Sequence, residues 1–586
     1  MKFNSVTGKK WTLKKFNQED INFLKKNFFL DEITSKLLSI RRVKKEDINI
    51  FLNPSIKNVL PDPKILKDME KAVKKTADII ISGNKKIGIF GDYDVDGASS
   101  TAILGTYFNQ LNQSFEIYIP DRKNEGYGPS VAGFNKLIET DVKLIFTVDC
   151  GTPSHEPINY AQKKNIDVIV LDHHQSDIKL PNAYSIVNPN RYDDNSNLNY
   201  LCASGVCFMF LVSLNKHLRE VNWFKDNSLS EPNLINYLDL VSLGTVCDVV
   251  PLIGLNRAIV KQGLKIIKLK KNLGLKTLID ICKIENHPTV SDLGFKIGPR
   301  INAGGRVGRC SHGANLLLNI NPKDTYKIAS ELDNFNKERQ ILEKELLDEI
   351  MKSTKINLKD PILILDGKNW HEGVIGIIAS RLKEKFNKPS IIISFNNKNI
   401  GKASARSVLG FDIGSAIIAA VEKKILKKGG GHKMAGGFSI EYSNLNIFRE
   451  FIIKKYTYQN QTIENQKICL LDAEISPSAI NLDFFNKIDN LSPFGSGNPE
   501  PKFALEKLRT VNSKIVGENH IKSVLSAEDG STIKTIAFNA VETELSYYLL
   551  NKSKNPFNIA GKISLNEWKG KKNVEFIIDD ISVIKK

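Results

Sequence analysis

Several features that define whole classes of protein are absent from this sequence of 586 residues. No apolar run approaches the ~20 residues that span a bilayer, so a membrane-spanning protein is not expected. The N-terminus reads MKFNSVTGKKW and lacks the apolar segment of a secretory signal. The seven cysteines form no CxxC pair, which argues against a disulfide framework and a structural zinc site. We therefore predict a reducing, cytoplasmic location.

The composition is that of a folded protein with an excess of basic residues. Hydrophobic residues make up 41% and charged residues 25% of the chain, which excludes a largely disordered protein. The formal net charge is +18, and an excess of this kind attracts polyanions, nucleic acid first. A lysine-rich background composition would explain the charge equally well. Charge therefore supports a nucleic-acid hypothesis but does not create one.

The order of apolar patterns predicts an α/β protein with several domains. Short β-rich runs at 86–90, 115–119, 143–148 and 167–171 alternate with helical stretches, which is typical of a parallel sheet with βαβ crossovers. A long charged helix, a second α/β unit and a segment of short alternating strands follow. We predict five parts: a basic helical region at 1–80, a parallel-sheet domain at 81–320, a connecting helix at 321–358, an α/β domain at 359–460 and a β-barrel at 461–586.

Three carboxylates lie in the run GDYDVDG, directly after the apolar run KIGIF. Asp92, Asp94 and Asp96 are too close to be ionised together unless a cation compensates their charge. A calcium loop of the EF-hand type would need Glu at its twelfth position, where this chain has Ile103. A divalent-metal site and a solvated turn remain as alternatives. The position at the carboxyl end of a parallel strand favours the metal site.

Two further predicted strands end in residues of the same kind. Asp149 follows KLIFTV, and Asp172, His173 and His174 follow DVIVL. Asp248 lies inside an apolar run, where a lone carboxylate is costly unless it is paired or bound to metal. A carboxylate-rich site with some imidazole suits Mn²⁺ or Mg²⁺ better than Zn²⁺. Two such ions would polarise a phosphoryl group and generate hydroxide, so the implied chemistry is phosphoester hydrolysis.

In this order and spacing, the motifs GDYDVDG, VDCG, DHH and GTVCDVVPL resemble the DHH phosphoesterase superfamily, and within it the single-strand-specific 5′→3′ exonucleases. The resemblance extends to PRINAGGR, HEGVIGIIASRL, GGGH and PFGSGNPE, and so covers nearly the whole chain. It implies a DHH-type parallel-sheet domain and a DHH-associated α/β domain joined by a long helix, plus a C-terminal oligonucleotide-binding (OB) barrel. The implied activity is hydrolysis of single-stranded DNA to mononucleotides in DNA repair and recombination.

The resemblance also implies a site for two ions, Mn²⁺ or Mg²⁺. Its metal ligands would be Asp94, Asp96, Asp149, His173 and Asp248. Asp149 would bridge the two ions, and His173 and Asp248 would complete the shell of the second one.

The remaining residues of the site take their roles from the same resemblance. His174 would contact the scissile phosphate, and Asp172 would orient its neighbours. Several relatives have a histidine ligand four residues before Asp94, but this chain has Phe90 there, which cannot bind a metal. Asp92 would supply the missing ligand.

Glycine-rich runs and arginines indicate contacts with phosphate. Backbone amides of glycine-rich loops approach phosphate closely, and arginine offers a forked set of donors. PRINAGGR has both features, and GGGHK has the same character. A glycine-rich surface turn and, for the helical Arg381, a surface salt bridge remain as alternatives. The predicted nucleic-acid-binding residues are Arg300, Asn302, Arg306, Ser380, Arg381, Arg406, Gly430, Gly431, His432, Lys433 and, in the barrel, Phe494.

Single-stranded DNA is the expected partner of a monomer, with a helicase or a single-strand-binding protein acting beside it. Two other functions fit the sequence less well. A DHH phosphodiesterase of dinucleotides, short RNA or cyclic dinucleotides would have no use for the basic N-terminal region and the barrel. A non-enzymatic scaffold would have no use for this number of acidic residues at one edge of a sheet.

Overall fold

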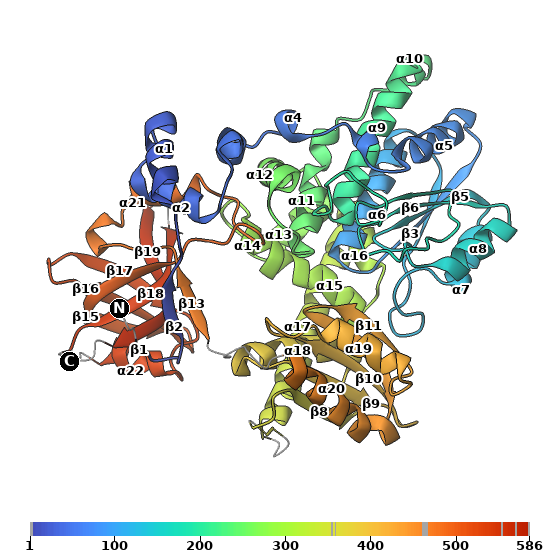
Figure 1. Cartoon of the computed structure of the whole chain (residues 1–586). Coiled ribbons are helices and arrows are strands. Elements are labelled where there is room, and N and C mark those ends of the chain that lie inside the picture. Colours follow the sequence, from blue (N-terminus) through green and yellow to red (C-terminus); the bar gives the residue numbers. More distant parts are fainter. Residues whose placement is uncertain are drawn as a thin grey trace. The chain divides into compact units, whose positions relative to one another are not determined.

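The structure is a computed structural model that describes residues 4–352, 356–357, 359–459, 467–551, 555–568 and 571–583 (Figure 1). The chain divides into two compact units. One unit combines residues 1–60, 251–261 and 465–586, and we call it the barrel unit; the other combines residues 61–250 and 262–464, and we call it the catalytic unit. None of the described helices is both long enough and apolar enough to cross a bilayer.

A five-stranded parallel sheet forms the first half of the catalytic unit. Its four longer strands lie where the sequence predicts strands, and a short fifth strand was not predicted. In spatial order the strands are β4 (Phe115–Tyr118), β3 (Lys86–Gly91), β5 (Val142–Val148), β6 (Asp167–Leu171) and β7 (Ser185–Val187).

Helices cover both faces of this sheet, which explains why its strands are almost wholly apolar. Successive side chains of β5 point to opposite faces. Ile145 belongs to a buried cluster with residues of α7 (Val131–Ile138) and α8 (His155–Lys163). Phe146 packs on the other face against Phe108 of α6 (Val95–Gln110) and Phe210 of α9 (Ala203–Glu220), with ring centroids 5.9 and 5.5 Å apart. In Figure 1, α7 and α8 lie on the opposite side of the sheet from α6.

The other helices of this half surround the sheet and lead to the second domain. The run PRINAGGR, which we expected to be a loop with free amides, is the helix α15 instead. Its glycines allow close packing: a Cβ atom on Gly305 would lie 2.9 Å from the ring of Tyr93. The helices are α5 (Met69–Ser82), α6 (Val95–Gln110), α9 (Ala203–Glu220), α10 (Trp223–Asp226), α11 (Leu238–Cys247), α12 (Gly254–Lys268), α13 (Leu273–Ile281), α14 (Val290–Asp292), α15 (Gly298–Val307), α16 (His312–Leu318) and α17 (Pro322–Lys352).

The second α/β domain follows α17, the predicted connecting helix. Its mixed sheet has β8 parallel to β9 and all other pairs antiparallel. The run GGGH, which we also expected to be a loop, lies in strand β11 and pairs with β12. The strands are, in spatial order, β11 (Lys428–His432), β12 (Ala435–Glu441), β10 (Ile400–Arg406), β9 (Ser390–Phe395) and β8 (Leu363–Lys368), and the helices are α18 (Glu372–Phe386), α19 (Ile413–Glu422) and α20 (Leu445–Gln459).

Five strands close into a barrel in the other unit, because each pairs with the next and β18 pairs back to β15. A turn at Asp529 and Gly530 connects two of them. In ring order the strands are β15 (Phe503–Val516), β16 (His520–Ser526), β17 (Thr532–Ala537), β19 (Lys571–Val583) and β18 (Phe557–Trp568).

The N-terminal residues pack onto this barrel rather than forming a region of their own. Strand β1 pairs with β19, and β2 pairs with β13. Leu24, Leu37 and Leu38 from α1 and α2 belong to the same buried core as the barrel strands. The elements involved are β1 (Asn4–Ser5), β2 (Lys10–Leu13), α1 (Gln18–Phe28), α2 (Glu32–Ile40), α3 (Ile48–Leu52), α4 (Ile56–Val59), β13 (Ile468–Leu471), β14 (Ala473–Glu474), α21 (Leu482–Asp489) and α22 (Glu544–Leu550).

Residues 251–261 join the barrel unit through Arg257. This arginine is 2% exposed and donates hydrogen bonds to the carbonyl oxygens of Phe51, Leu491, Ser492 and Pro493. Its guanidinium also lies 3.9 Å from the centre of the Phe51 ring. A buried cation is tolerated only when its donors are satisfied, and here backbone carbonyls satisfy them. Three separate parts of the sequence are tied together at this side chain.

Candidate metal centre

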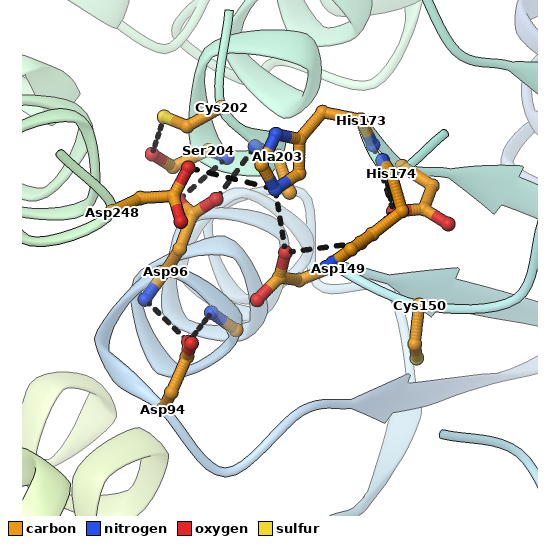
Figure 2. Close-up of polar contacts among 12 residues, drawn as sticks. Asp94, Asp96, Asp149, Cys150, His173, His174, Cys202, Ala203, Ser204 and Asp248 are labelled. Carbon is orange, nitrogen blue, oxygen red and sulfur yellow. Dashed lines mark hydrogen bonds and ion pairs between the residues drawn. The ribbon is translucent and has the colours of Figure 1, made fainter. Parts of the chain in front are cut away.

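The carboxyl ends of three neighbouring strands bring the predicted acids and histidines to one edge of the sheet. Gly91 at the end of β3 is in register with Val148 of β5, and Val148 is in register with Leu171 of β6. The residues that follow these three positions therefore emerge side by side. Figure 2 shows how the side chains of Asp149 and His173 converge with acids from α6 and from the end of α11.

Seven of the predicted residues form three overlapping groups. In each group one ligand atom per residue lies within 4.8 Å of the others. Asp149 and His173 each belong to two groups, so the groups form one continuous cluster. The groups are Asp92, Asp94 and Asp149; Asp96, His173 and Asp248; and Asp149, His173 and His174.

Several atoms at the centre of this cluster are buried without a hydrogen-bond partner. They are Asp92 Oδ1, Asp149 Oδ1, His173 Nε2 and Asp248 Oδ2. The Nε2 atom of His173 lies 3.3 Å from Asp149 Oδ1 and 3.6 Å from Asp248 Oδ2. Buried polar atoms are normally paired, because leaving them unpaired is costly. The donor set of carboxylate oxygens and one imidazole fits Mn²⁺ or Mg²⁺.

Burial and mutual repulsion disfavour the charged forms of the clustered acids. Burial, and then the charge of Asp94, raises the pKa of Asp92 and of Asp149 well above the ordinary range. Burial also raises the pKa of Asp96, and burial followed by the charge of Asp96 raises the pKa of Asp248 to about 8. A divalent cation would supply the missing positive charge and reverse these shifts.

Helix N-termini hold two of the acids in place. Asp94 caps α6, since its Oδ1 atom accepts hydrogen bonds from Asp96 N at 2.9 Å and Gly97 N at 3.0 Å. Asp96 in turn accepts from Ala203 N at 2.6 Å and Ser204 N at 3.0 Å at the start of α9. The N-terminus of a helix stabilises negative charge. Both carboxylates are therefore oriented before any cation binds.

Asp172 lies beside the cluster and holds His174. It accepts hydrogen bonds from Thr152 N, His173 N and, at 2.8 Å, from Nδ1 of His174. Burial raises the pKa of Asp172, but the bond and charge of His174 outweigh it and leave the pKa below the ordinary range. Burial lowers the pKa of His174, but Asp172 outweighs it and raises the value to about 9. The hydrogen bond to Asp172 therefore favours the imidazolium form of His174.

Tyr127 was not predicted but also lies in this site. Its hydroxyl donates to the carbonyl oxygen of Asp149 at 2.8 Å and lies 3.1 Å from Nε2 of His174. Gly126 and Gly128, on either side of it, have φ angles of 88° and 77°. An aromatic residue between two glycines in EGYG is the signal that could have identified it, because such a segment presents its side chain from a constrained loop.

Phe90 points away from the cluster. Its ring is fully buried and packs against Tyr118 and Phe134, with centroids 5.3 and 5.6 Å away. Asp92 instead lies within 4.8 Å of Asp94 and Asp149. That Asp92 takes the place of a missing ligand stays a prediction.

A cavity of about 650 Å³ adjoins the cluster, between the parallel-sheet domain and the second α/β domain. Tyr93, which lies between Asp92 and Asp94 in the sequence, and Tyr127 both contribute to its wall. Six basic side chains line it but only two acidic ones. The basic residues are Arg122, Lys123, Arg306, Lys402, Arg406 and Lys428, and the acidic ones are Glu125 and Glu372.

The arginines of this cavity are close enough to repel one another. Arg306 donates to the carbonyl oxygen of Gly373 at 3.0 Å. Burial, and then the neighbouring charges of Arg122 and other arginines, lowers the pKa of Arg306 to about 10. The pKa of Arg406 is lowered by burial and by Arg122. A cavity with this excess of positive charge fits a phosphate group.

The other predicted nucleic-acid contacts lie elsewhere. Arg300 bonds to Asp333 at 2.9 Å, and Arg381 forms an ion pair with Glu343. Within the chain, these two arginines therefore already have acidic partners, which Arg306 and Arg406 lack among the described residues. Asn302 and Ser380 are half-buried on α15 and α18, Gly430, Gly431 and His432 lie in β11, Lys433 follows it exposed, and Phe494 is half-buried against the barrel core.

Three family models match the chain. They are described as "DHH family, N-terminal domain", matched at residues 86–245, "DHHA1 domain", matched at 359–457, and "RecJ OB domain", matched at 471–580. These spans fall within the three largest of the five predicted parts.

The chain is similar over most of its length to curated and solved proteins. The single-stranded-DNA-specific exonuclease RecJ of Escherichia coli (strain K12) is 33% identical over 542 residues, which cover 90% of this chain and 92% of that protein. The protein of the same name from Bacillus subtilis (strain 168) is 30% identical over 98% of this chain and 71% of its own length. The crystal structure of RecJ in complex with Mn²⁺ from Thermus thermophilus has a TM-score of 0.79 at 25% identity, and covers 98% of this chain and 80% of that one. The corresponding Mg²⁺ complex has a TM-score of 0.74.

Proposed function

Because this chain belongs to the RecJ family of single-stranded-DNA-specific exonucleases, we propose that it hydrolyses single-stranded DNA from the 5′ end and releases mononucleotides. It is a metal-dependent phosphodiester hydrolase of DNA repair and recombination. The observation that supports this best is the cluster of five aspartates and two histidines beside a cavity with uncompensated arginines.

The cluster fits two divalent ions, Mn²⁺ or Mg²⁺. Asp92 and Asp94 would hold one, His173, Asp96 and Asp248 the other, and Asp149 would contact both. The ions, when bound, polarise the phosphodiester and lower the pKa of a bound water. A histidine that binds a metal ion has to be neutral. Burial lowers the pKa of His173 and so favours its neutral form.

His174 acts on the phosphate from the side of the cluster. As an imidazolium held by Asp172, it presents a positive charge in a fixed orientation. We assign it a hydrogen bond to an oxygen of the scissile phosphate, where the charge would favour the developing negative charge. The ring of Tyr127 packs edge-on against the imidazole, with the centroids 5.6 Å apart.

The cavity binds a phosphate of the strand next to the one that is cleaved. A terminal monophosphate carries more negative charge than a diester, so a cavity whose Arg306 and Arg406 have no acidic partner in the described part of the chain favours a strand end over a strand interior. This is the physical basis that we propose for exonuclease rather than endonuclease action. The 5′→3′ direction itself rests on the family.

The enzyme acts as a monomer in the cytoplasm and depends on other proteins for its substrate. Duplex DNA presents no free single strand, so a helicase has to unwind it first. A single-strand-binding protein then occupies the same strand as the enzyme. All seven cysteines are free thiols, which agrees with a reducing compartment.

Labelled substrates test the function. With Mn²⁺, a 5′-labelled single strand should release labelled mononucleotide from the start, a 3′-labelled strand should shorten gradually, and blunt duplex should stay intact. Dinucleotide cleaved faster than the strand would favour the small-substrate phosphodiesterase instead. Cleavage by Asp149→Asn at the wild-type rate would show that the cluster is not the active site.

A further inference from the structure

A fourth strand end reaches the edge where the metal cluster lies. Strand β7 is parallel to β6, with Val187 in register with Leu171. Asp172 N donates to the carbonyl oxygen of Val187 at 3.2 Å. Asn188, the residue after β7, therefore emerges beside Asp172, the residue after β6. The parallel register that brings the acids together at the ends of three strands also places an asparagine at the end of the fourth.

Asn188 is fully buried, and both polar atoms of its side chain form hydrogen bonds. Its Nδ2 atom donates to the carbonyl oxygen of His174 at 2.9 Å and to Oγ1 of Thr152 at 2.8 Å. Its Oδ1 atom accepts from Asn190 N at 2.8 Å. Thr152 N in turn donates to Asp172. One amide side chain thus connects the backbone of His174 with the loop that holds the carboxylate partner of its imidazole.

Asn190 forms a hydrogen bond with the backbone of the other histidine, His173. Its Nδ2 atom donates to the carbonyl oxygen of His173 at 2.5 Å. Residues 172–178 contain neither helix nor strand, so no ladder of backbone hydrogen bonds fixes this loop. Among the described residues, the hydrogen bonds to the carbonyls of His173 and His174 come from Asn190 and Asn188 respectively.

We propose that Asn188 and Asn190 are positioning residues for the reaction, and that each sets the direction of one histidine. Asn190 orients His173 toward the metal side, and Asn188 orients His174 toward the phosphate side. Adjacent histidines can take different roles only if each backbone carbonyl, and with it the ψ angle of that residue, is held separately. This inference rests on the roles that the proposed function gives to the two histidines.

The two asparagines should have separable effects. Asn190→Ala loosens a metal ligand, so Mn²⁺ affinity should fall about 10- to 100-fold, while kcat largely recovers at saturating Mn²⁺. Asn188→Ala loosens the group that contacts phosphate, so kcat should fall about 10- to 100-fold at saturating Mn²⁺. In that variant the Mn²⁺ affinity and the KM for the strand should stay unchanged. A purely structural role would lower the Tm of both variants without this division.

The experiment combines steady-state kinetics, Mn²⁺ titration followed by the paramagnetic resonance of the free ion, and thermal unfolding of the full chain. Asn182→Ala is the matched control, since the exposed side-chain amide of Asn182 bonds to Gln162 and to no other residue that the structure describes. Asn188→Asp preserves the side-chain volume and the bond from Asn190 N but removes both donated bonds. It keeps the test decisive if Asn188→Ala does not fold, and it too should lose turnover.

Wild-type kinetics in Asn190→Ala, or in either Asn188 variant, would overturn the inference. Equal effects of both substitutions on Mn²⁺ affinity would also overturn it. His173→Ala and His174→Ala distinguish this failure from that of the proposed function. If the histidine variants remain active, the proposed roles are wrong; if they are inactive while the asparagine variants are not, only the positioning inference fails.

Discussion

Neutralising Arg406 should weaken strand binding in a way that depends on salt. Arg406 lines the cavity beside the metal cluster, and in the described parts of the chain its guanidinium bonds only to Ser404 and to the carbonyl oxygen of Ala405. None of the described acids forms an ion pair with it, so its charge is available to a phosphate. Arg381 is the matched control, because it lies in the same domain but is paired with Glu343.

The charges of the cavity give the size of the effect. Six basic and two acidic side chains leave four positive charges uncompensated. For a single strand, log K falls with log salt by about 0.7 for each phosphate neutralised, so this cavity contributes a slope of about −3. Arg406→Gln should make the slope shallower by about 0.7. Because a hydrogen bond to a charged group contributes about 1.5–3 kcal/mol, affinity at low salt should fall about 10- to 100-fold.

Fluorescence anisotropy of a labelled 5′-phosphorylated strand, titrated at several salt concentrations with Ca²⁺ or without metal, measures both quantities without cleavage. Arg381→Gln should leave the slope and the affinity near wild type. The same slope in Arg406→Gln and the wild type would refute the placement of the phosphate in this cavity. An equal change in both variants would show that the arginines act through the overall charge of the protein.

Four further results are expected. Asp149→Asn should lower turnover by on the order of 100-fold or more, with single-strand binding in anisotropy titrations nearly intact; turnover within tenfold of wild type would contradict the ligand role. His174→Ala should lower kcat by on the order of 100-fold and keep Mn²⁺ binding in a titration, and loss of Mn²⁺ would mean that its role and that of His173 are exchanged. Burial raises the pKa of Asp239 to about 7, so the folded state loses stability as pH rises from about 4 through 7; Asp239→Asn should therefore gain Tm over wild type at pH 8 but little at pH 5, and an equal gain at both would refute the titration. Arg257→Met should destabilise the barrel unit by on the order of 3 kcal/mol in denaturant unfolding, since four carbonyl oxygens lose the guanidinium donor, although those of Leu491 and Pro493 keep Asn498 Nδ2 as a second donor.

The parallel sheet and its acids could be predicted because both signals are local. Each of the four longer strands is an apolar run flanked by polar residues, and Asp149 and Asp172 come directly after such runs. Parallel strands share a carboxyl edge, so no further information was needed to bring these residues together. The position of Asp248 could not be predicted from such local signals. Asp248 directly follows α11, and its place in the cluster depends on how that helix packs against α6 and α9.

The glycine-rich runs were misinterpreted because glycine permits two opposite structures. In PRINAGGR and GGGH we expected exposed loops with free amides. The structure has a helix and a strand there, in which glycine leaves room for a neighbour, such as Tyr93 against Gly305. Composition does not distinguish a residue chosen for backbone freedom from one chosen for its small size. Only the packing partner, distant in the sequence, decides between them.

Asn188 was not predicted because the strand before it is short. The N-terminal strands were not predicted because their partners are distant in the sequence. Strand β7 has three residues, too few for a periodic pattern, and β1 and β2 find partners more than 400 residues away. Non-local pairing leaves no trace in a window of ten residues. Functional residues after such strands therefore escape a local search, even when their contacts are as specific as those of the metal ligands.

The composition of the barrel unit determines how its role in strand binding can be isolated. Cutting the chain near residue 465 removes the barrel strands but keeps Leu24, Leu37, Leu38 and Ile48, which belong to the barrel core. It also keeps Arg257 without the carbonyls of 491–493. Exposed leucines and an unpaired, formerly buried cation would promote aggregation, and any lost binding would then be ambiguous. A barrel-free protein has to lack residues 1–60 as well as 465–586 and to carry a small polar residue at position 257. Because three parts of the sequence build this unit, removing the C-terminal part alone leaves the other two without their core partners.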